Sequence, residues 1–414
     1  MSQIAKAYPR RTNVPMLLII FAVVMFGLII LYSVSGPAGY AKPIEERSSM
    51  FYVGRQIAFT VFGLILMLII NFIPVNFFKS KFIWMGSYIL SLLAVLSVEA
   101  FGYTLNGAKR WILVGSTTVQ PSEFVKFLLI IFVAGYSSWI KELKKSGRLK
   151  QPSGALAKLL SETFFEFLLP VGLAGVIDIF IAAQPHMSCA LIVAAIVFLS
   201  MVNAGVRLRA WITGAIIVIP IAVLGLGIYF TQKPDALDNF SHVFQRIRVF
   251  SAVHGDEDAD VTEDDLRQVT NAHNALGSGG MWGRGLGNSR AKYNYVSEAQ
   301  NDYIFSIYVE ETGFVGGTLL ILMYMTMFAM CFMVVIRADS NFSRILAVGC
   351  TAIPMVQFLL NIAVELQVIP STGVTLPFVS YGGTAQLALL ITYGIILSVS
   401  RSGTVPRGVP RVEE

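Results

Sequence analysis

Asp302 is the first candidate for chemistry in this sequence. It stands in the run Asn-Asp-Tyr-Ile-Phe, after a glycine-rich polar stretch that begins at Gly277 and before an apolar run that begins near Phe314. A carboxylate at such a boundary lies where water meets membrane, and it can act as a general base that removes a proton from a hydroxyl. Aspartate is also a preferred helix N-cap, so the alternative is that Asp302 only caps the helix that follows.

A second candidate group combines an acid and a base. Glu123 and Lys126 are three residues apart at the expected start of an apolar helix, which is close enough for an ion pair. Ionisable residues at membrane depth are costly, so each is a functional candidate, although the pair could also neutralise itself and brace two helices. Gln120, Pro121 and Ser122 are typical of a helix start, with Ser122 or Gln120 available to bond main-chain amides.

Three arginines are candidates for binding an anionic group. Arg110 precedes Trp111, an aromatic residue of the kind found at membrane interfaces. Arg246 and Arg248 lie in a stretch where apolar residues recur at helical spacing from Phe240 to Phe250, which predicts a helix on the membrane surface or over a cavity mouth. A second short helix is predicted from Leu266 to Leu276. The acidic run between the two helices lacks the glycine and the closing glutamate of a calcium loop, so we expect a solvated turn.

The segment from Pro370 to Gly383 is interrupted by prolines and glycines. Irregular backbone at membrane depth is tolerated only where it is buried in protein or lines a wet cavity. We therefore expect it to line the same outward cavity as Asp302, with a simple exposed loop as the alternative. Its candidate residues are Ser380 as a substrate contact and Gly373, Pro377, Gly382 and Gly383 as backbone positions.

Composition places these residues in a membrane protein. Hydrophobic residues make up 55% of the chain and charged residues only 14%, well below the roughly 25% of soluble domains. The expected fold is an all-α integral membrane protein with about ten transmembrane helices. The first spans about Pro15 to Val34, and the others centre near Phe62, Leu92, Ile130, Gly172, Ile196, Val218, Leu322, Met355 and Leu390.

The basic residues set the expected orientation. Short loops on the side of the N-terminus hold most of the lysines and arginines, which predicts that both termini are cytoplasmic. Residues 1–14 and 402–414 are then cytoplasmic ends of one membrane domain, and residues 231–301 form a large, partly helical extracellular loop between helices 7 and 8. Because the net charge of +6 is spread over these loops, we expect no nucleic-acid partner.

These candidates together fit one reaction. If the substrate is a lipid-linked sugar diphosphate, a sugar hydroxyl attacks an anomeric carbon as the diphosphate leaves. A carboxylate base contributes about 10²–10⁴-fold to such a step. The leaving group needs positive charge, which the arginines, Lys126 or a divalent cation such as Mg²⁺ or Mn²⁺ could supply. No metal ligands can be assigned from the sequence.

The runs QPSEFVK (120–126), NDYIF (301–305) and PSTGVTLPFVSYGG (370–383) make the chain resemble the SEDS family of peptidoglycan glycosyltransferases. The resemblance implies that Asp302 is the catalytic base, that Glu123 and Lys126 belong to the family's QPSE-x-x-K motif, and that Glu310 and Glu311 belong to its EE-x-G motif. It also implies lipid II as substrate, polymerised with inversion at the anomeric carbon. The implied partners are a class B penicillin-binding protein and other division or elongation membrane proteins, in the bacterial cytoplasmic membrane.

Two positions depart from the family pattern. His186 replaces the acid of a QPD motif, and Asn-Asp-Tyr at 301–303 replaces the common Thr-Asp-Phe. Two other functions remain open: a lipid II flippase and a non-catalytic scaffold. The sequence does not distinguish division, elongation and sporulation. Anionic lipid is a further expected partner, at the cytoplasmic segments near Lys141 to Lys158.

Overall fold

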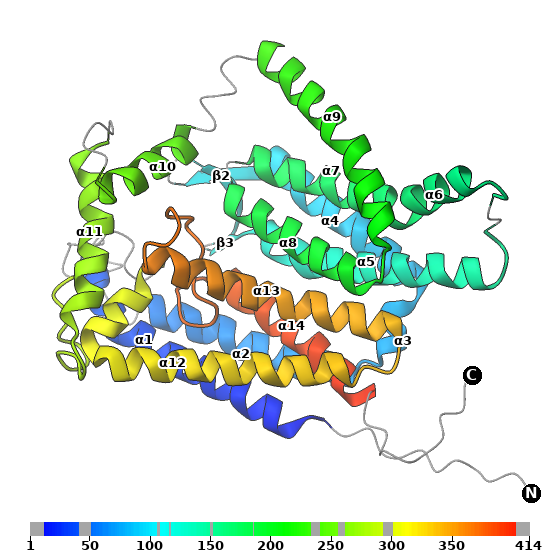
Figure 1. Cartoon of the computed structure of the whole chain (residues 1–414). Helices are drawn as coiled ribbons and strands as arrows, with labels where there is room; N and C mark the ends of the chain where they lie inside the picture. Colours follow the sequence, from blue (N-terminus) through cyan, green and yellow to red (C-terminus); the bar gives the residue numbers. More distant parts are fainter. Residues whose placement is uncertain are drawn as a thin grey trace, which may run out of the picture.

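A computed structural model describes residues 12–40, 51–105, 108–115, 117–149, 152–184, 186–232, 241–255, 261–292 and 301–402. The described chain is mostly helical, and its long helices run side by side as a bundle (Figure 1). Eight helical segments among these residues are long and apolar enough to cross a membrane. They lie in α1 (Val14–Tyr40), α2 (Phe51–Phe72), α4 (Lys81–Phe101), α5 (Pro121–Lys145), Ala155–Ala183, α12 (Ile304–Ile336), α13 (Asn341–Glu365) and α14 (Gly383–Ser402).

Two of the ten predicted spans correspond to shorter apolar stretches. The segment Ala155–Ala183 is continuous through α6 (Ala155–Thr163), a π-helical turn (Phe164–Leu168) and α7 (Leu169–Ala183). After it, α8 (Met187–Asn203) and α9 (Leu208–Gln232) match the predicted segments near Ile196 and Val218. The apolar stretches there, Met187–Asn203 and Leu208–Pro220, are shorter than the eight spans. The all-helical membrane fold is confirmed, whereas the count of ten spans stays a prediction.

The bundle has a protein-buried centre and a lipid-facing rim. In the apolar windows of α5, α13 and α14, 83%, 67% and 72% of residues are buried inside the protein, against 28–39% in the other five spans. Apolar side chains exposed on those five spans need a hydrocarbon environment. The polar motif residues on α5, α13 and the start of α14 are thus held by the least lipid-exposed helices.

The two ends of the bundle differ. At one end lie the start of α1 and the end of α14 (Figure 1). Ion pairs gather there: Lys79, at the end of the short helix α3 (Val75–Lys79), with Glu142 at 2.7 Å, Arg207 with Glu162 at 3.0 Å, and Lys144 with Glu166. This is the end that the basic-residue pattern assigns to the cytoplasm.

The opposite end carries the predicted surface helices. They are α10 (Ser241–Val253) and α11 (Glu263–Ser278), close to the two stretches where the spacing predicts helices (Figure 1). Residues 233–240, 256–260 and 293–300 of the predicted loop 231–301 lie outside the described residues, as do nearly all of the predicted ends 1–14 and 402–414.

A small sheet at this end was not predicted. Three antiparallel strands, β1 (Gly102–Leu105), β2 (Ala108–Val114) and β3 (Thr117–Val119), pair in chain order, with Ile112 opposite both Gly102 and Val119. The run of β-branched residues in β3 and the turn at Gly115, whose φ is 61°, favour a hairpin. The sheet follows α4, leads into α5 and carries Arg110.

Candidate functional site

Asp302 stands immediately before α12 and is not its N-cap. The cap position is Tyr303, whose side chain makes no capping hydrogen bond. The carboxylate of Glu365, at the end of α13, takes the capping role: it accepts hydrogen bonds from the main-chain N–H groups of Phe305 (3.2 Å) and Ser306 (3.0 Å), and from the Ser306 hydroxyl. The simple alternative for Asp302, a helix cap, does not describe its position.

Asn361 fixes the main chain around Asp302. Its amide nitrogen donates to the carbonyl oxygens of Asp302 at 3.0 Å and of Val374 at 2.9 Å. Asn361 and Glu365 are four residues apart, so they share one face of α13. Through these hydrogen bonds, one face of α13 fixes the Asp302 turn, the first turn of α12 and the segment 370–383 relative to one another.

The broken segment reaches the Asp302 carboxylate at Gly373. The φ of Gly373 is 67°, and a Cβ atom built there would lie 3.5 Å from Oδ2 of Asp302 and 3.6 Å from Nη2 of Arg246. A Cβ at this position would be in van der Waals contact with both charged groups, and the positive φ would strain any side chain there. The Asp302 carboxylate and the Arg246 guanidinium therefore both lie next to the main chain of Gly373.

The other motif residues of the segment have structural contacts. The hydroxyl of Ser380, predicted to touch substrate, donates to the carbonyl oxygen of Asn301 at 2.6 Å and accepts from the N–H of Leu376 at 2.8 Å. The Pro377 carbonyl accepts a bond from the Tyr324 hydroxyl. The Gly382 N–H donates to Oε1 of Gln56 at 3.2 Å, and Gly383 begins α14. Ser380 is 4% exposed, which favours a bracing role.

The three candidate arginines are not equivalent. Burial lowers the pKa of the Arg110 guanidinium, the nearby Asp302 carboxylate acts in the opposite direction, and Arg246 lowers that pKa further. Arg110 also stacks on Trp111, 4.4 Å from the ring centre. Arg246 and Arg248 are both exposed, but Arg248 lies about 200° around α10 from Arg246. The structure therefore brings Arg110 and Arg246 to Asp302, while Arg248 points elsewhere.

The motif at the start of α5 is tied to His186. Pro121 occupies the first turn of α5, and Gln120 is the N-cap without a side-chain capping bond, which corrects the expected amide contacts. The amide nitrogen of Gln120 lies 3.3 Å from Nδ1 of His186, and the Ser122 hydroxyl lies 3.4 Å from the same atom. The predicted ion pair forms, with Nζ of Lys126 2.8 Å from Glu123.

Several cations converge on His186. Burial holds the pKa of its imidazole well below the usual value, and the positive charges of Arg110, Lys126 and Arg246 lower that pKa further. The ring is thus neutral near pH 7. Through it, the α5 motif and the Asp302 cluster belong to one electrostatic neighbourhood.

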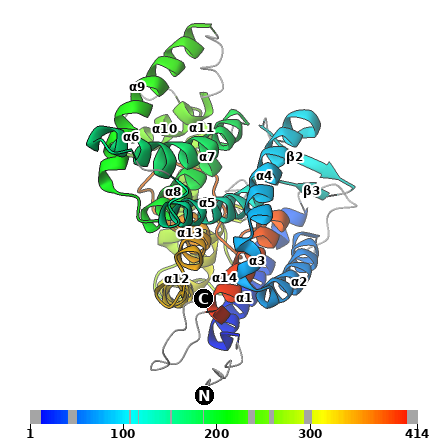
Figure 2. The same ribbon diagram turned by 90° about the vertical axis from the view of Figure 1, so that its right-hand side faces the viewer.

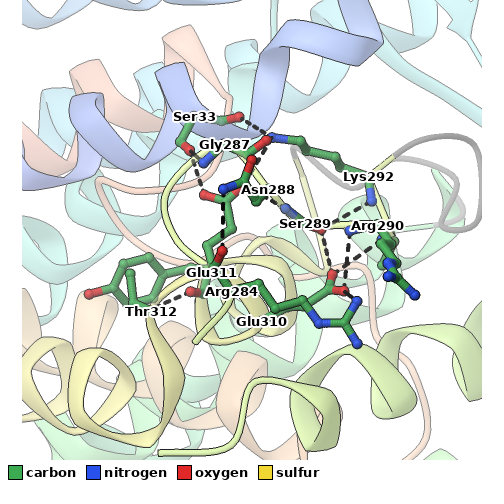
Figure 3. A network of polar contacts seen from close by, with 12 residues as sticks. Ser33, Arg284, Gly287, Asn288, Ser289, Arg290, Lys292, Glu310, Glu311 and Thr312 are labelled. Atoms are coloured by element: carbon green, nitrogen blue, oxygen red, sulfur yellow. Dashed lines mark hydrogen bonds and ion pairs between the residues drawn. The ribbon is translucent and has the colours of Figure 1, made fainter. Parts of the chain in front are cut away.

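The second acid of the EE pair, Glu311, is enclosed in protein. Its carboxylate lies 2.9 Å from Nζ of Lys292 and accepts from the Ser33 hydroxyl of α1 at 2.5 Å (Figure 3). Both members of the ion pair have side chains no more than 3% exposed. Nearby, Gly313 interrupts α12 with a φ of 71°, and a Cβ there would lie 2.4 Å from the nitrogen of Gly283.

Glu310 binds the same glycine-rich segment. Its carboxylate accepts from the Ser289 hydroxyl at 2.5 Å and from the N–H groups of Arg290 and Ala291 at 3.2 Å each, and it pairs with Arg284 at 3.2 Å (Figure 3). Together the two acids fasten residues 279–292 to the start of α12. Both motif acids are thus bonded within the protein.

The donor set around Asp302 does not fit a resident divalent cation. Among the residues that the structure describes, no three His, Cys, Asp or Glu side chains gather as metal ligands. The neighbouring acid, Glu365, has both oxygens bonded to the start of α12, and the other charged neighbours are arginines. Hard cations such as Mg²⁺ prefer several oxygen ligands, which this group of described residues does not offer.

Sequence reasoning missed Asn361, Glu365 and Lys292. Asn361 and Glu365 are polar residues in the last turns of an apolar helix. Because burying a polar side chain in a membrane span costs free energy, their presence there could have marked them as candidates. Lys292 lies in a polar loop, where a lysine is ordinarily solvated. Only the tertiary structure shows that it is buried against Glu311.

We expect Glu365→Ala to destabilise the protein by about 2–3 kcal/mol, because two main-chain N–H groups and a hydroxyl lose their buried acceptor. Thermal unfolding of the purified protein in detergent measures this. The matched control is Glu142→Ala, which removes an acid from an exposed ion pair worth about 0–1 kcal/mol. Equal shifts for the two variants would contradict the capping role.

The fold and site define a multi-pass membrane protein in which charged residues from α10, the start of α12, the end of α13 and the small sheet lie close together. The family model described as "Cell cycle protein", covering FtsW, RodA and SpoVE, matches residues 14–404. The chain therefore belongs to this family, the SEDS proteins.

Named relatives and solved structures agree with this. Stage V sporulation protein E of Bacillus subtilis is 27% identical over 405 residues, covering 95% of this chain and 98% of the relative. A probable peptidoglycan glycosyltransferase FtsW of Trichlorobacter lovleyi is 30% identical over 386 residues, covering 93% and 92%. The rod shape determining protein RodA of Thermus thermophilus superposes with a TM-score of 0.60 at 21% identity, covering 95% of this chain and 98% of that one. A chain from a structure of a peptidoglycan synthase complex superposes with a TM-score of 0.64 at 22% identity, again covering 95% of this chain and 98% of that one. The fold is thus RodA-like.

Proposed function

We propose that this protein is a peptidoglycan glycosyltransferase that polymerises lipid II at the outer face of the bacterial cytoplasmic membrane. Its relatives carry that activity in their names. The observation that carries the assignment to this site is the meeting of the Asp302 carboxylate, Arg246 and Gly373, with Arg110 and Lys126 in electrostatic reach of the same cluster.

The cluster supplies the groups that the reaction needs. The Asp302 carboxylate takes the proton of the acceptor sugar hydroxyl as its oxygen attacks the anomeric carbon of the donor. The bond from that carbon to the diphosphate oxygen breaks, and the leaving diphosphate keeps the electron pair. Arg246 and Arg110 offset its charge, with Lys126 behind them. Since the leaving group needs no proton, one carboxylate suffices, and direct displacement inverts the anomeric carbon.

The orientation and partners follow from the same proposal. The Asp302 end of the bundle faces outward, and both termini are cytoplasmic, because the lysines and arginines gather at the opposite end. A chain of this fold occurs in a structure of a peptidoglycan synthase complex. That supports a class B penicillin-binding protein as partner, beside other division or elongation proteins.

Arg246 and Arg248 provide a matched pair for testing the diphosphate contact. We expect Arg246→Ala to lower kcat/KM for lipid II by about 10²-fold, as loss of a charge-assisted contact to a desolvated phosphate would. Arg248→Ala should change it less than about threefold, because that side chain leaves α10 about 200° away from Arg246 and so lies on the other face of the helix. Initial rates over a range of lipid II concentrations measure both. Similar decreases in kcat/KM for the two variants would show that Arg246 does not contact the diphosphate.

Reconstitution tests the function itself. The purified protein with its cognate penicillin-binding protein is given lipid II in detergent, and glycan strands are resolved on a gel. Formation of glycan strands would support the glycosyltransferase function. If no strands form while labelled lipid II crosses vesicles containing the protein, it is a flippase. If neither occurs, the chain acts as a scaffold.

A further inference from the structure

A second cluster of positive charge lies at the end of the bundle opposite Asp302. Figure 2 faces this end, where α5, α8 and α13 lie side by side. Nζ of Lys141 on α5 and Nη2 of Arg344 on α13 both donate to one neutral acceptor, Oδ1 of Asn341, at 3.3 and 3.1 Å. Two cations sharing one amide oxygen leave positive charge that this acceptor does not neutralise.

The cluster also has more donors than acceptors. Nδ2 of Asn341 is buried and has no hydrogen-bond partner among the residues that the structure describes. Glu166 is within electrostatic reach of Lys141, but its carboxylate is bonded to Lys144. An oxyanion fits such a surplus of donors and charge.

A largely apolar pocket adjoins Lys141. Lys141 and Glu166 lie on its wall, and the rest is mainly Tyr136, Ile140, Phe165, Ala204 and Val206. The pocket is thus charged on one side and apolar on the other, and Lys141 lies close to the end of the apolar segment Pro121–Lys145. A free phosphate would use only the charged side.

We propose that Lys141, Arg344 and this pocket bind an anionic phospholipid of the leaflet at this end, with the phosphate at the two cations and the upper acyl chain against the apolar wall. The site is independent of the glycosyltransferase chemistry, because it is built from the other ends of α5 and α13. It recognises phosphate esters that carry a net negative charge.

Native mass spectrometry of the full chain with phosphatidylglycerol or phosphatidylcholine tests this. The wild type should retain phosphatidylglycerol in preference to phosphatidylcholine. The double variant Lys141→Ala/Arg344→Ala should bind phosphatidylglycerol roughly 30-fold more weakly, since each surface cation contributes roughly a factor of five to anionic-lipid binding. The control is Arg148→Ala/Arg209→Ala, which removes the same charge from exposed positions off the pocket.

A second variant distinguishes binding of a whole phospholipid from binding of the phosphate group alone. Val206→Trp fills the pocket without changing charge, so it should weaken phosphatidylglycerol binding, and inorganic phosphate should not compete at millimolar concentration. Equal retention of the two lipids, or equal losses in the two double variants, would overturn the proposal. So would tight binding of inorganic phosphate that Val206→Trp leaves unchanged, which would define a free-anion site.

Discussion

Asp302→Asn is expected to lower the rate of lipid II polymerisation by about 10²–10⁴-fold, the usual contribution of a positioned general base. The amide keeps the size of the side chain and cannot take a proton. Because Asn361 and Ser380 hold the main chain of this turn, the variant should fold normally. Single-turnover formation of the first glycosidic bond measures the chemical step.

The matched control for this substitution is Asp339→Asn, at an exposed position at the other end of the bundle. It should polymerise lipid II at the wild-type rate. If Asp302→Asn retained more than about a tenth of wild-type activity, Asp302 would not be the base. The acid of the buried Glu123–Lys126 pair would then be the next candidate.

Lys292→Met is expected to be the most destabilising of these substitutions, by about 3–5 kcal/mol, because it leaves the charge of Glu311 buried without its ion-pair partner. Glu311 also accepts from Ser33, so the strain would reach α1 as well as the start of α12. The yield of monodisperse protein and its thermal unfolding temperature in detergent measure this effect.

Arg284→Met is the matched comparison for the neighbouring pair. Arg284 is 33% exposed, and Glu310 keeps three other donors when it is removed. It should therefore cost only about 1 kcal/mol. If Lys292→Met were as mild, residues 279–292 would not be fastened to α12 by the Glu311 pair.

The apolar runs and the spacing of residues near Phe244 predict most of this fold, because membrane thickness and helical periodicity constrain both strongly. The Glu123–Lys126 pair also follows from spacing alone and is present. The convergence of Asp302 with Arg246 and Gly373 joins three segments. The irregular backbone of 370–383 predicted a place beside Asp302, but the sequence could not distinguish Arg246 from Arg248.

Other features needed tertiary information. The strands β1–β3 are short and lie between two long helices, so their period-two signal is weak. The sequence around Asn361 and Glu365 is typical of the end of an apolar helix. Their roles could not be predicted because their partners are main-chain groups 13 to 60 residues away. His186 looked like a lost acid, whereas its contacts with Gln120 and Ser122 make it a buried, neutral link to the α5 motif.

The most direct test of the account is the anomeric configuration of the bond that the protein makes. Among the residues that the structure describes, the acid nearest the Asp302 turn is Glu365, and its carboxylate is bonded to the start of α12 rather than free for a covalent intermediate. Nuclear magnetic resonance of strands made from isotope-labelled lipid II should show inversion relative to the donor. Retention of configuration, or a glycosyl adduct on Asp302 detected by mass spectrometry, would contradict direct displacement assisted by Asp302.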